Sequence, residues 1–310
     1  MTDMIAALQQ AASLAALRTT AFGTSRRDKI ASAEVEDDNG AIKGAARVNV
    51  NILAGADEVH NKIMEQMRDA RASFMAKTST WDAEAWRLLP NALFMDLARD
   101  IRLAQDKISV LVTQLREDAP TIIARATTNL GALGARVTMP TTDALCSAYS
   151  LSVEYIPIPD GSKFSGMNPK VVEWLQKRLE KQVMEKAATA MRDPMHKAAE
   201  QLLALADRME KINELDGLGT DASGGKSRVP YFKNTIVTNL EATVTLLEHF
   251  NLLGDPAFAA IVSKIGDLLS GVTPDALRKD HDLREAASRH ARDILGMVNA
   301  YTGNTSLNPT

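Results

Sequence analysis

The chain has few of the residues that usually form disulfides, metal centres or aromatic binding platforms. Its 310 residues include one cysteine, Cys146, five histidines and only 5% aromatic residues. A single cysteine excludes a disulfide within the chain, so we interpret Cys146 as a small core residue. No two histidines lie four residues apart on one predicted helix, which is the spacing with which a helix binds zinc. We therefore predict no internal disulfide and no metal site.

Neither charge sign dominates, and no long hydrophobic run is present. The chain carries 36 Lys and Arg against 39 Asp and Glu, a formal net charge of −3. This balance provides no strong positive field, so we expect neither nucleic acid nor a membrane as a partner. No apolar run approaches the roughly 18 residues of a membrane span. The N-terminal segment begins with Asp3 instead of a basic region. We therefore expect a cytoplasmic protein without a signal peptide.

Long helical patterns make up most of the sequence. Hydrophobic residues account for 45% of the chain, which is enough for a sizeable core. Apolar residues recur in steps of three and four over residues 94–115, 198–212 and 283–301. This is the spacing of a coiled-coil seam. We predict a mainly α fold, an elongated multi-helix bundle with coiled-coil-like seams and a small two-stranded β-ribbon.

Two short segments alternate apolar and polar residues and are predicted to be the strands of this ribbon. They lie near residues 47–53 and 149–156, and we expect them to pair with each other. Residues 1–46 are interpreted as an N-terminal helix followed by a flexible arm. Residues 47–302 then form the helical domain, and residues 303–310 form a disordered tail.

Prolines are predicted to set helix boundaries. Pro120 is interpreted as the start of a second helix, because proline is tolerated in the first turn. Pro194 is expected to kink or split the longest helical pattern. Residues 255–256 (DP) and 273–274 (TP) each place a capping side chain before a proline, so each pair should start a helix.

The seams are also the candidates for an interaction surface. In a compact bundle such seams bury against each other, which is the favoured interpretation, and docking of a partner is the alternative. The candidate seam residues are Phe94, Leu97, Ile101, Ile108, Leu111, Leu115, Leu283, His290 and Ile294. Of these, His290 lies on an apolar stripe and is interpreted as a core or interface residue instead of a ligand.

No motif predicts a catalytic residue or a cofactor site. Residues 225–227 (GKS) imitate the end of a phosphate-binding loop, but the first glycine of that motif would fall at Thr220. Four acidic residues within 34–38 lack the ligand ladder of a calcium loop and are interpreted as solvated charge. Residues 26–29 (RRDK) form the one compact basic cluster. Contact with a phosphate is one interpretation of this cluster, and a solvated linker is the favoured one.

Three segments in order carry a resemblance to a known family: residues 155–166 (YIPIPDGSKFSG), 232–240 (FKNTIVTNL) and 250–256 (FNLLGDP). Together with the long helix after the first, they resemble a family of helical proteins of unknown function from bacteriophages and bacteria, over about residues 47–301. The resemblance implies genes near a MoxR-type AAA+ ATPase and a cobaltochelatase-like protein with a von Willebrand A domain. It brings no catalytic motif to transfer.

We therefore expect a non-enzymatic, phage-type protein that acts through protein–protein interaction. The resemblance implies a role as an accessory or adaptor of such an ATPase, and the seams would also allow a homo-oligomer. For a phage-encoded protein the compartment is the host cytoplasm. Two alternatives stay open: a virion structural or assembly component, and an enzyme whose site is formed by dispersed carboxylates.

Overall fold

The computed structural model describes residues 2–82, 85–160, 168–216 and 234–303. The fold is mainly α, as the sequence predicts. The chain divides into two compact units, each assembled from segments far apart in sequence. Unit 1 comprises residues 1–15, 77–94 and 155–310, and unit 2 comprises residues 16–76 and 95–154. The predicted boundary at residue 46 therefore lies inside unit 2.

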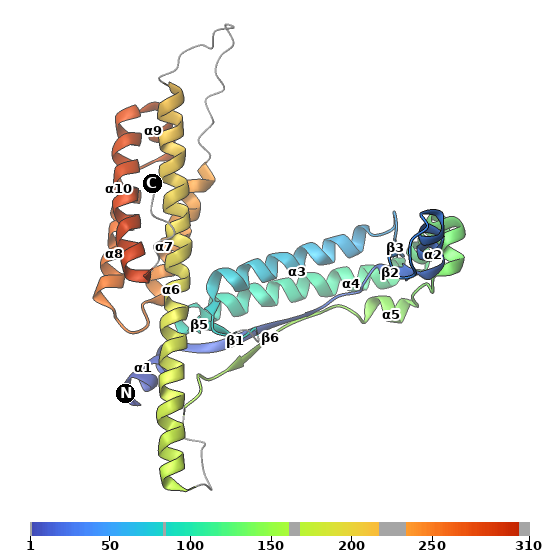
Figure 1. Ribbon diagram of the computed structural model, residues 1–310, viewed down its shortest axis with the longest axis horizontal. Coiled ribbons are helices and arrows are strands. Elements are labelled where there is room, and N and C mark those ends of the chain that lie inside the picture. The colour runs from blue at the N-terminus through green and yellow to red at the C-terminus, as the bar shows by residue number, and fades with distance from the viewer. Residues whose placement is uncertain (1, 83–84, 161–167, 217–233, 304–310) are drawn as a thin grey trace. The chain divides into compact units, whose positions relative to one another are not determined.

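In unit 2, two long helices run side by side (Figure 1). Helix α3 spans Glu58–Lys77 and helix α4 spans Phe94–Leu130, with its residues from Met95 onward in this unit. Arg125 on α4 bonds to Glu58 at 2.5 Å, and Ser73 on α3 donates to Asp100 at 2.7 Å, so the two helices are antiparallel. Each buries one stripe of apolar residues spaced by three and four. The stripe of α3 comprises Val59, Ile63, Met67, Ala70 and Phe74.

The strands form two sheets, and the predicted pairing of 47–53 with 149–156 is wrong. A four-stranded sheet has the order β4-β5-β1-β6, and a two-stranded sheet joins β2 to β3. The partner of β3 is thus β2, in antiparallel register from Ser25 with Asn51 to Asp28 with Val48. Strand β6 instead lies beside β1. The strands are β1 (Ala12–Thr20), β2 (Ser25–Asp28), β3 (Val48–Asn51), β4 (Ser79–Thr80), β5 (Arg87–Pro90) and β6 (Ser150–Ile156).

The first 46 residues are not a helix followed by a flexible arm. Helix α1 ends at Ala11, and the chain continues as β1, β2 and helix α2 (Lys29–Asp38). Residues 12–20 are rich in alanine and read locally as helix, but pairing with β5 and β6 overrides that propensity. Asp28 caps α2 by accepting bonds from the backbone N–H groups of Ile30 and Ala31.

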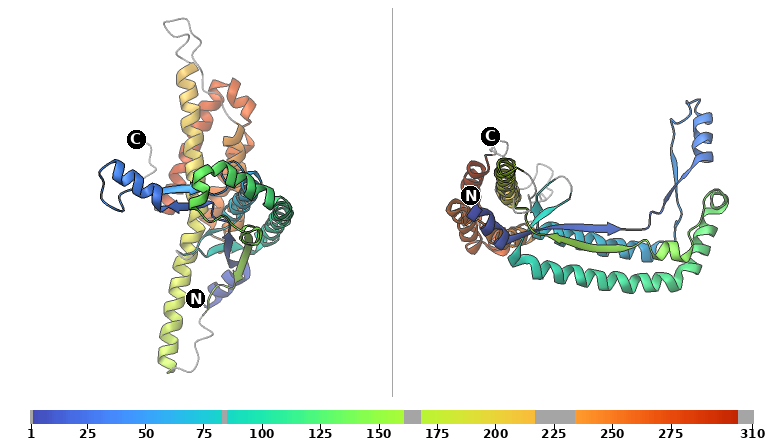
Figure 2. Two further views of the ribbon diagram at one scale, coloured as in Figure 1. Left: turned by 90° about the vertical axis from the view of Figure 1, so that its right-hand side faces the viewer. Right: turned by 90° about the horizontal axis from the view of Figure 1, so that it is seen from below.

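A helical bundle forms most of unit 1. Figures 1 and 2 show α7, α8 and α10 alongside the C-terminal part of α6, whereas the N-terminal turns of α6 extend past them. Asp255 and Thr273 cap α8 and α9 and precede a proline in each, which confirms the two predicted helix starts. The helices are α6 (Pro169–Asp216), α7 (Asn234–Phe250), α8 (Pro256–Ser270), α9 (Pro274–Lys279) and α10 (His281–Thr302). The short helices η1 (Asn91–Leu93), η2 (Gly131–Arg136) and α5 (Thr142–Cys146) complete the fold.

Two prolines lie inside helices: the helix start predicted at Pro120 is wrong, and of the kink or split predicted at Pro194 the split is wrong. Helix α4 continues through Pro120 and α6 through Pro194, so neither proline starts or splits a helix. Proline lacks the N–H that would bond to the carbonyl four residues earlier. For Pro194 that carbonyl belongs to Ala190, and the Ser79 hydroxyl donates to it at 2.5 Å. The strand β4 thus replaces the bond that the proline removes.

Candidate functional site

The predicted interaction seam is covered by the chain itself. On α4, Leu97, Ile101, Ile108 and Leu115 are buried. Phe94 and Leu111 are half-buried, as are Leu283 and His290 on α10, and Ile294 is fully enclosed. These residues belong to two different units. Each seam stabilises the unit to which it belongs, because the apolar stripe of each helix faces a neighbouring element of that unit.

Among the described residues of unit 1, the most exposed large apolar side chain is Trp174 in the N-terminal turns of α6. Between residues 169 and 182 no side chain is buried, and the first buried residue of α6 is Val183. Trp174 is 56% exposed and Val171 is 45% exposed. With about 3.6 residues per turn, these two and the half-buried Leu175 share one side of the helix. We call Val171, Trp174 and Leu175 the docking face.

The N-terminal turns of α6 carry a small excess of positive charge, although Lys177 pairs with Glu173 and Lys181 lies 3.8 Å from Glu185. Residues 169–182 contain four Lys and Arg against two Glu, whereas the whole chain has a net charge of −3. The guanidinium of Arg178 lies 5.3 Å from the centre of the Trp174 ring. By helical spacing Lys181 lies on the flank of the docking face, and Glu173 and Glu180 lie on the opposite side of α6. This face therefore suits a partner that combines apolar with acidic side chains.

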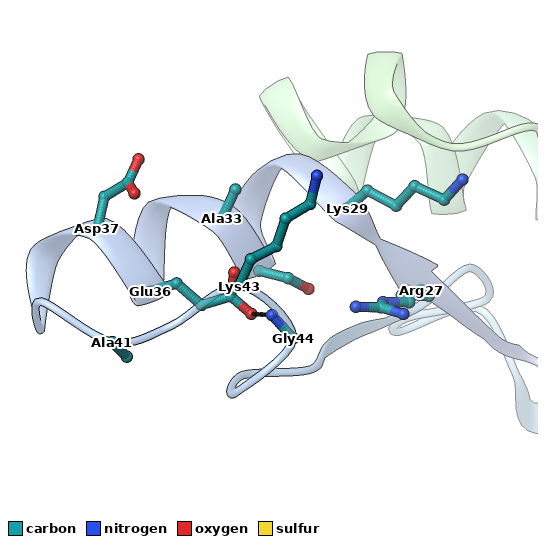
Figure 3. A pocket seen from close by; sticks show the side chains of 9 residues that line it. Arg27, Lys29, Ala33, Glu36, Asp37, Ala41, Lys43 and Gly44 are labelled. Carbon is teal, nitrogen blue, oxygen red and sulfur yellow. Dashed lines mark hydrogen bonds between the residues drawn. The ribbon is translucent and has the colours of Figure 1, made fainter.

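A second candidate is a hollow of about 630 Å³ beside α2 in unit 2, which we call the α2 hollow (Figure 3). Three cationic side chains line it: Arg27 from β2, Lys29 from the first turn of α2, and Lys43 from the loop that follows. Within the described ranges, none of the three forms an ion pair with a carboxylate. Glu36 and Asp37 also belong to the lining.

Buried polar side chains fix the shape of the α2 hollow. Glu36, 6% exposed, accepts bonds from the backbone N–H groups of Gly44 and Ala46 at 2.8 and 3.0 Å. Ser32, 2% exposed, donates to the Asp28 carbonyl and accepts from the N–H of Val48. The loop over residues 39–47 is therefore tied back onto α2, so Lys43 comes beside residues that precede it by up to 16 positions.

A third candidate is a cluster of titratable groups in unit 2. The Nδ1 atom of His60 lies 2.7 Å from the hydroxyl oxygen of Tyr149, and Cys146 is close enough to affect Tyr149 electrostatically. Burial lowers the pKa of His60 and raises the pKa of Tyr149 to about 12. Burial also raises the pKa of the Cys146 thiol. The hydrogen bond between His60 and Tyr149 joins α3 to the segment before β6, and a raised thiol pKa is not the property of an activated cysteine.

Sequence reasoning missed most of these features. It did not single out Trp174, because side chains on the docking face follow the same three-and-four spacing as buried ones. It did find the basic cluster at 26–29, but Lys43 joins that cluster only through the fold. His60 and Tyr149 lie 89 positions apart, so no local signal connects them. The GKS segment at 225–227 and the residues after Gly303 lie outside the described residues.

Other site types gain no support from the described part of the chain. It contains no group of three or more His, Cys, Asp or Glu side chains arranged to hold a metal ion. It also contains no helix that is long and apolar enough to cross a membrane. No family model matches the chain, and neither a curated protein nor a solved structure shows significant similarity to it.

Proposed function

We propose that this chain acts by binding another protein through the docking face of α6, without catalysing a reaction. The observation that carries the proposal is the exposure of Trp174 and Val171 on helical turns in which no side chain is buried. A tryptophan in water leaves a large apolar surface uncovered, and tryptophan and arginine are the residues that most often dominate binding energy at interfaces.

The chemistry of the docking face defines the partner. Arg178 stacks on Trp174, and Lys181 flanks the same side of the helix. We propose that the partner contributes an amphipathic helix whose apolar residues cover Trp174 and whose Asp or Glu residues approach Arg178 and Lys181. The family resemblance supports a MoxR-type AAA+ ATPase as the protein that carries this helix, with the chain as its accessory or adaptor.

A co-purification experiment tests this function. The full-length chain, tagged, is expected to retain the neighbouring AAA+ ATPase on an affinity resin. Replacing the apolar anchor by Trp174→Asp should lower the retained amount at least tenfold, because an aspartate both removes the ring and repels an acidic partner. The matched control is Met95→Asp, which places the same charge at a residue of α4 that is 73% exposed.

Two outcomes contradict the proposal. In one, wild-type chain retains no ATPase. In the other, Trp174→Asp retains as much ATPase as Met95→Asp does, so that the contact lies elsewhere on the molecule.

Mass spectrometry of purified phage particles tests the alternative of a virion component. An accessory protein is expected to be absent from the particle, whereas a structural protein is present in stoichiometric amounts.

A further inference from the structure

We propose that the α2 hollow binds an anionic group, a phosphate or a carboxylate, of a ligand distinct from the α6 partner. The hollow brings Arg27, Lys29 and Lys43 to one concave site in unit 2, far from the docking face in sequence. The lining holds three cations against the two carboxylates of Glu36 and Asp37, and a bound anion balances the excess positive charge. The arrangement is therefore the kind that acidic ligands recognise.

Two arginines close to the hollow are engaged within the chain, unlike the three cations that line it. Arg136 pairs with Glu34 at 3.2 Å, and Arg26 lies over the Phe22 ring and donates to the carbonyls of Gly23 and Ser25. Arg26 and Arg136 are thus engaged within the chain, whereas the three cations of the hollow remain available to a ligand.

The carboxylates of the lining do not replace a ligand. One oxygen of Glu36 accepts two backbone N–H groups, so part of its hydrogen-bonding capacity is already used within the chain. In Figure 3 the carboxylate of Asp37 points away from Lys43 and Arg27. Lys29 also occupies the first position of α2, where the helix dipole disfavours a cation. An anion bound there reduces this unfavourable interaction.

The hollow is built without the ligand. Ser32, Glu36 and the capping residue Asp28 are buried and hold β2, α2 and the 39–47 loop by hydrogen bonds. A preformed site loses little conformational freedom when it binds. Its volume of about 630 Å³ suits a phosphorylated small molecule or the side chains of an acidic peptide.

Isothermal titration of the full chain with two ligands tests the proposal. The ligands are inorganic pyrophosphate and a hexaglutamate peptide, and binding of one but not the other identifies the source of the anion. We expect at least one to bind with a 1:1 stoichiometry. Lys43→Gln should weaken binding at least threefold and Arg27→Gln/Lys43→Gln at least tenfold. Both residues are exposed, and circular dichroism checks that the variants keep their helix content.

The control is Lys62→Gln/Lys107→Gln, which removes two exposed lysines from α3 and α4 of the same unit. This variant should bind like wild type. Failure of both ligands to bind the wild-type chain would falsify the proposal. Equal losses in the control and in Arg27→Gln/Lys43→Gln would also overturn it, since binding would then follow net charge alone. None of these results bears on the docking face, because Trp174 is unchanged in every variant.

Discussion

Helices α4 and α6 both continue through a proline, but they are stabilised in different ways. Helix α4 buries a purely aliphatic and alanine stripe against its neighbours, and Pro120 is exposed. Helix α6 buries Pro194, and a side chain from another element supplies the hydrogen bond that this proline lacks. Ser79 donates to Ala190, and Arg292 of α10 binds Glu210 through two nitrogens. A proline is thus tolerated in two ways, by leaving the carbonyl to water or by supplying another donor.

Helices α4 and α6 also differ in how much of their apolar stripe is covered by other elements. The stripe of α4 is covered from Leu97 to Leu130, so its regular spacing serves the core of unit 2. In α6 only the part from Val183 onward is covered, and the earlier turns expose Trp174. Two helices with similar patterns therefore have different roles, and the difference lies in what packs against them.

The largest expected effect is on the α4 stripe. Leu115 is 1% exposed, and Leu115→Ala should destabilise unit 2 by about 3 kcal/mol, because a buried leucine loses its contacts and leaves a cavity. All three tryptophans lie in unit 1. Chemical denaturation should therefore shift the circular dichroism transition of unit 2 and leave tryptophan fluorescence unchanged. Leu111→Ala, at a half-buried position, is the control and should cost less. A parallel shift in fluorescence would mean that the units unfold together.

The second prediction concerns the exposed proline of α4. Pro120→Ala restores an N–H that can bond to the carbonyl of Arg116, to which no side chain in the described ranges donates. We expect unit 2 to gain about 1–3 kcal/mol, because proline is the least favourable residue in a helix interior. The measurement is the denaturation midpoint by circular dichroism. An unchanged or lower midpoint would show that water already satisfies this carbonyl fully.

The third prediction is that the buried proline of α6 is coupled to Ser79. Ser79→Ala should destabilise unit 1 by about 1–2 kcal/mol, since it leaves the Ala190 carbonyl buried without a donor. In a Pro194→Ala background the restored N–H bonds to that carbonyl, so the cost of Ser79→Ala should fall by about 1 kcal/mol. A double-mutant cycle followed by tryptophan fluorescence measures this coupling. Additive effects would contradict it.

How much of this contrast the sequence predicts depends on how local each interaction is. The stripe of α4 and the capped starts at Asp255 and Thr273 follow from neighbouring residues, and all are confirmed. The partner of β3 does not follow from neighbouring residues, because strand pairing depends on distant segments. The sequence of β2 is charged and is typical of a linker. The role of Ser79 cannot be predicted from local sequence either, because its hydroxyl donates to the carbonyl of Ala190, 111 positions away.

The candidate sites show the same limit. The acidic residues at 34–38 look equally solvated in sequence. In the structure Glu36 is buried under backbone N–H groups, Glu34 pairs with Arg136, and Asp37 and Asp38 are exposed. Spacing does not predict the exposure of Trp174, because an apolar residue at helical spacing is compatible with a core and with an interface. Only tertiary packing separates these cases.

The fourth prediction uses pH to test how much the ion pair between Arg292 and Glu210 stabilises unit 1. The hydrogen bonds from Arg292 hold the pKa of Glu210 below its usual value of 4.5. A carboxylate with a lowered folded-state pKa stabilises the fold above pH 4.5, and this contribution is lost as the pH falls through the folded-state pKa. Because Glu210 is 43% exposed, solvent screens the pair, and we expect Glu210→Gln to cost less than about 1 kcal/mol at pH 7. Fluorescence-detected unfolding should show this difference shrinking as the pH falls below 4.5, and a constant difference would contradict the role of the ion pair.

The smallest expected effect is at the docking face itself. Trp174→Ser removes the largest apolar side chain of these turns, yet we expect the unfolding free energy of unit 1 to change by less than about 0.5 kcal/mol, since the side chain is mostly in water. Trp81→Ser, at a residue 6% exposed in the same unit, is the matched control and should cost several-fold more. Circular dichroism is the readout, because both changes alter fluorescence directly. A tryptophan whose loss leaves stability unchanged but lowers partner binding contributes to recognition, whereas a large loss of stability would mean that Trp174 is a core residue of unit 1.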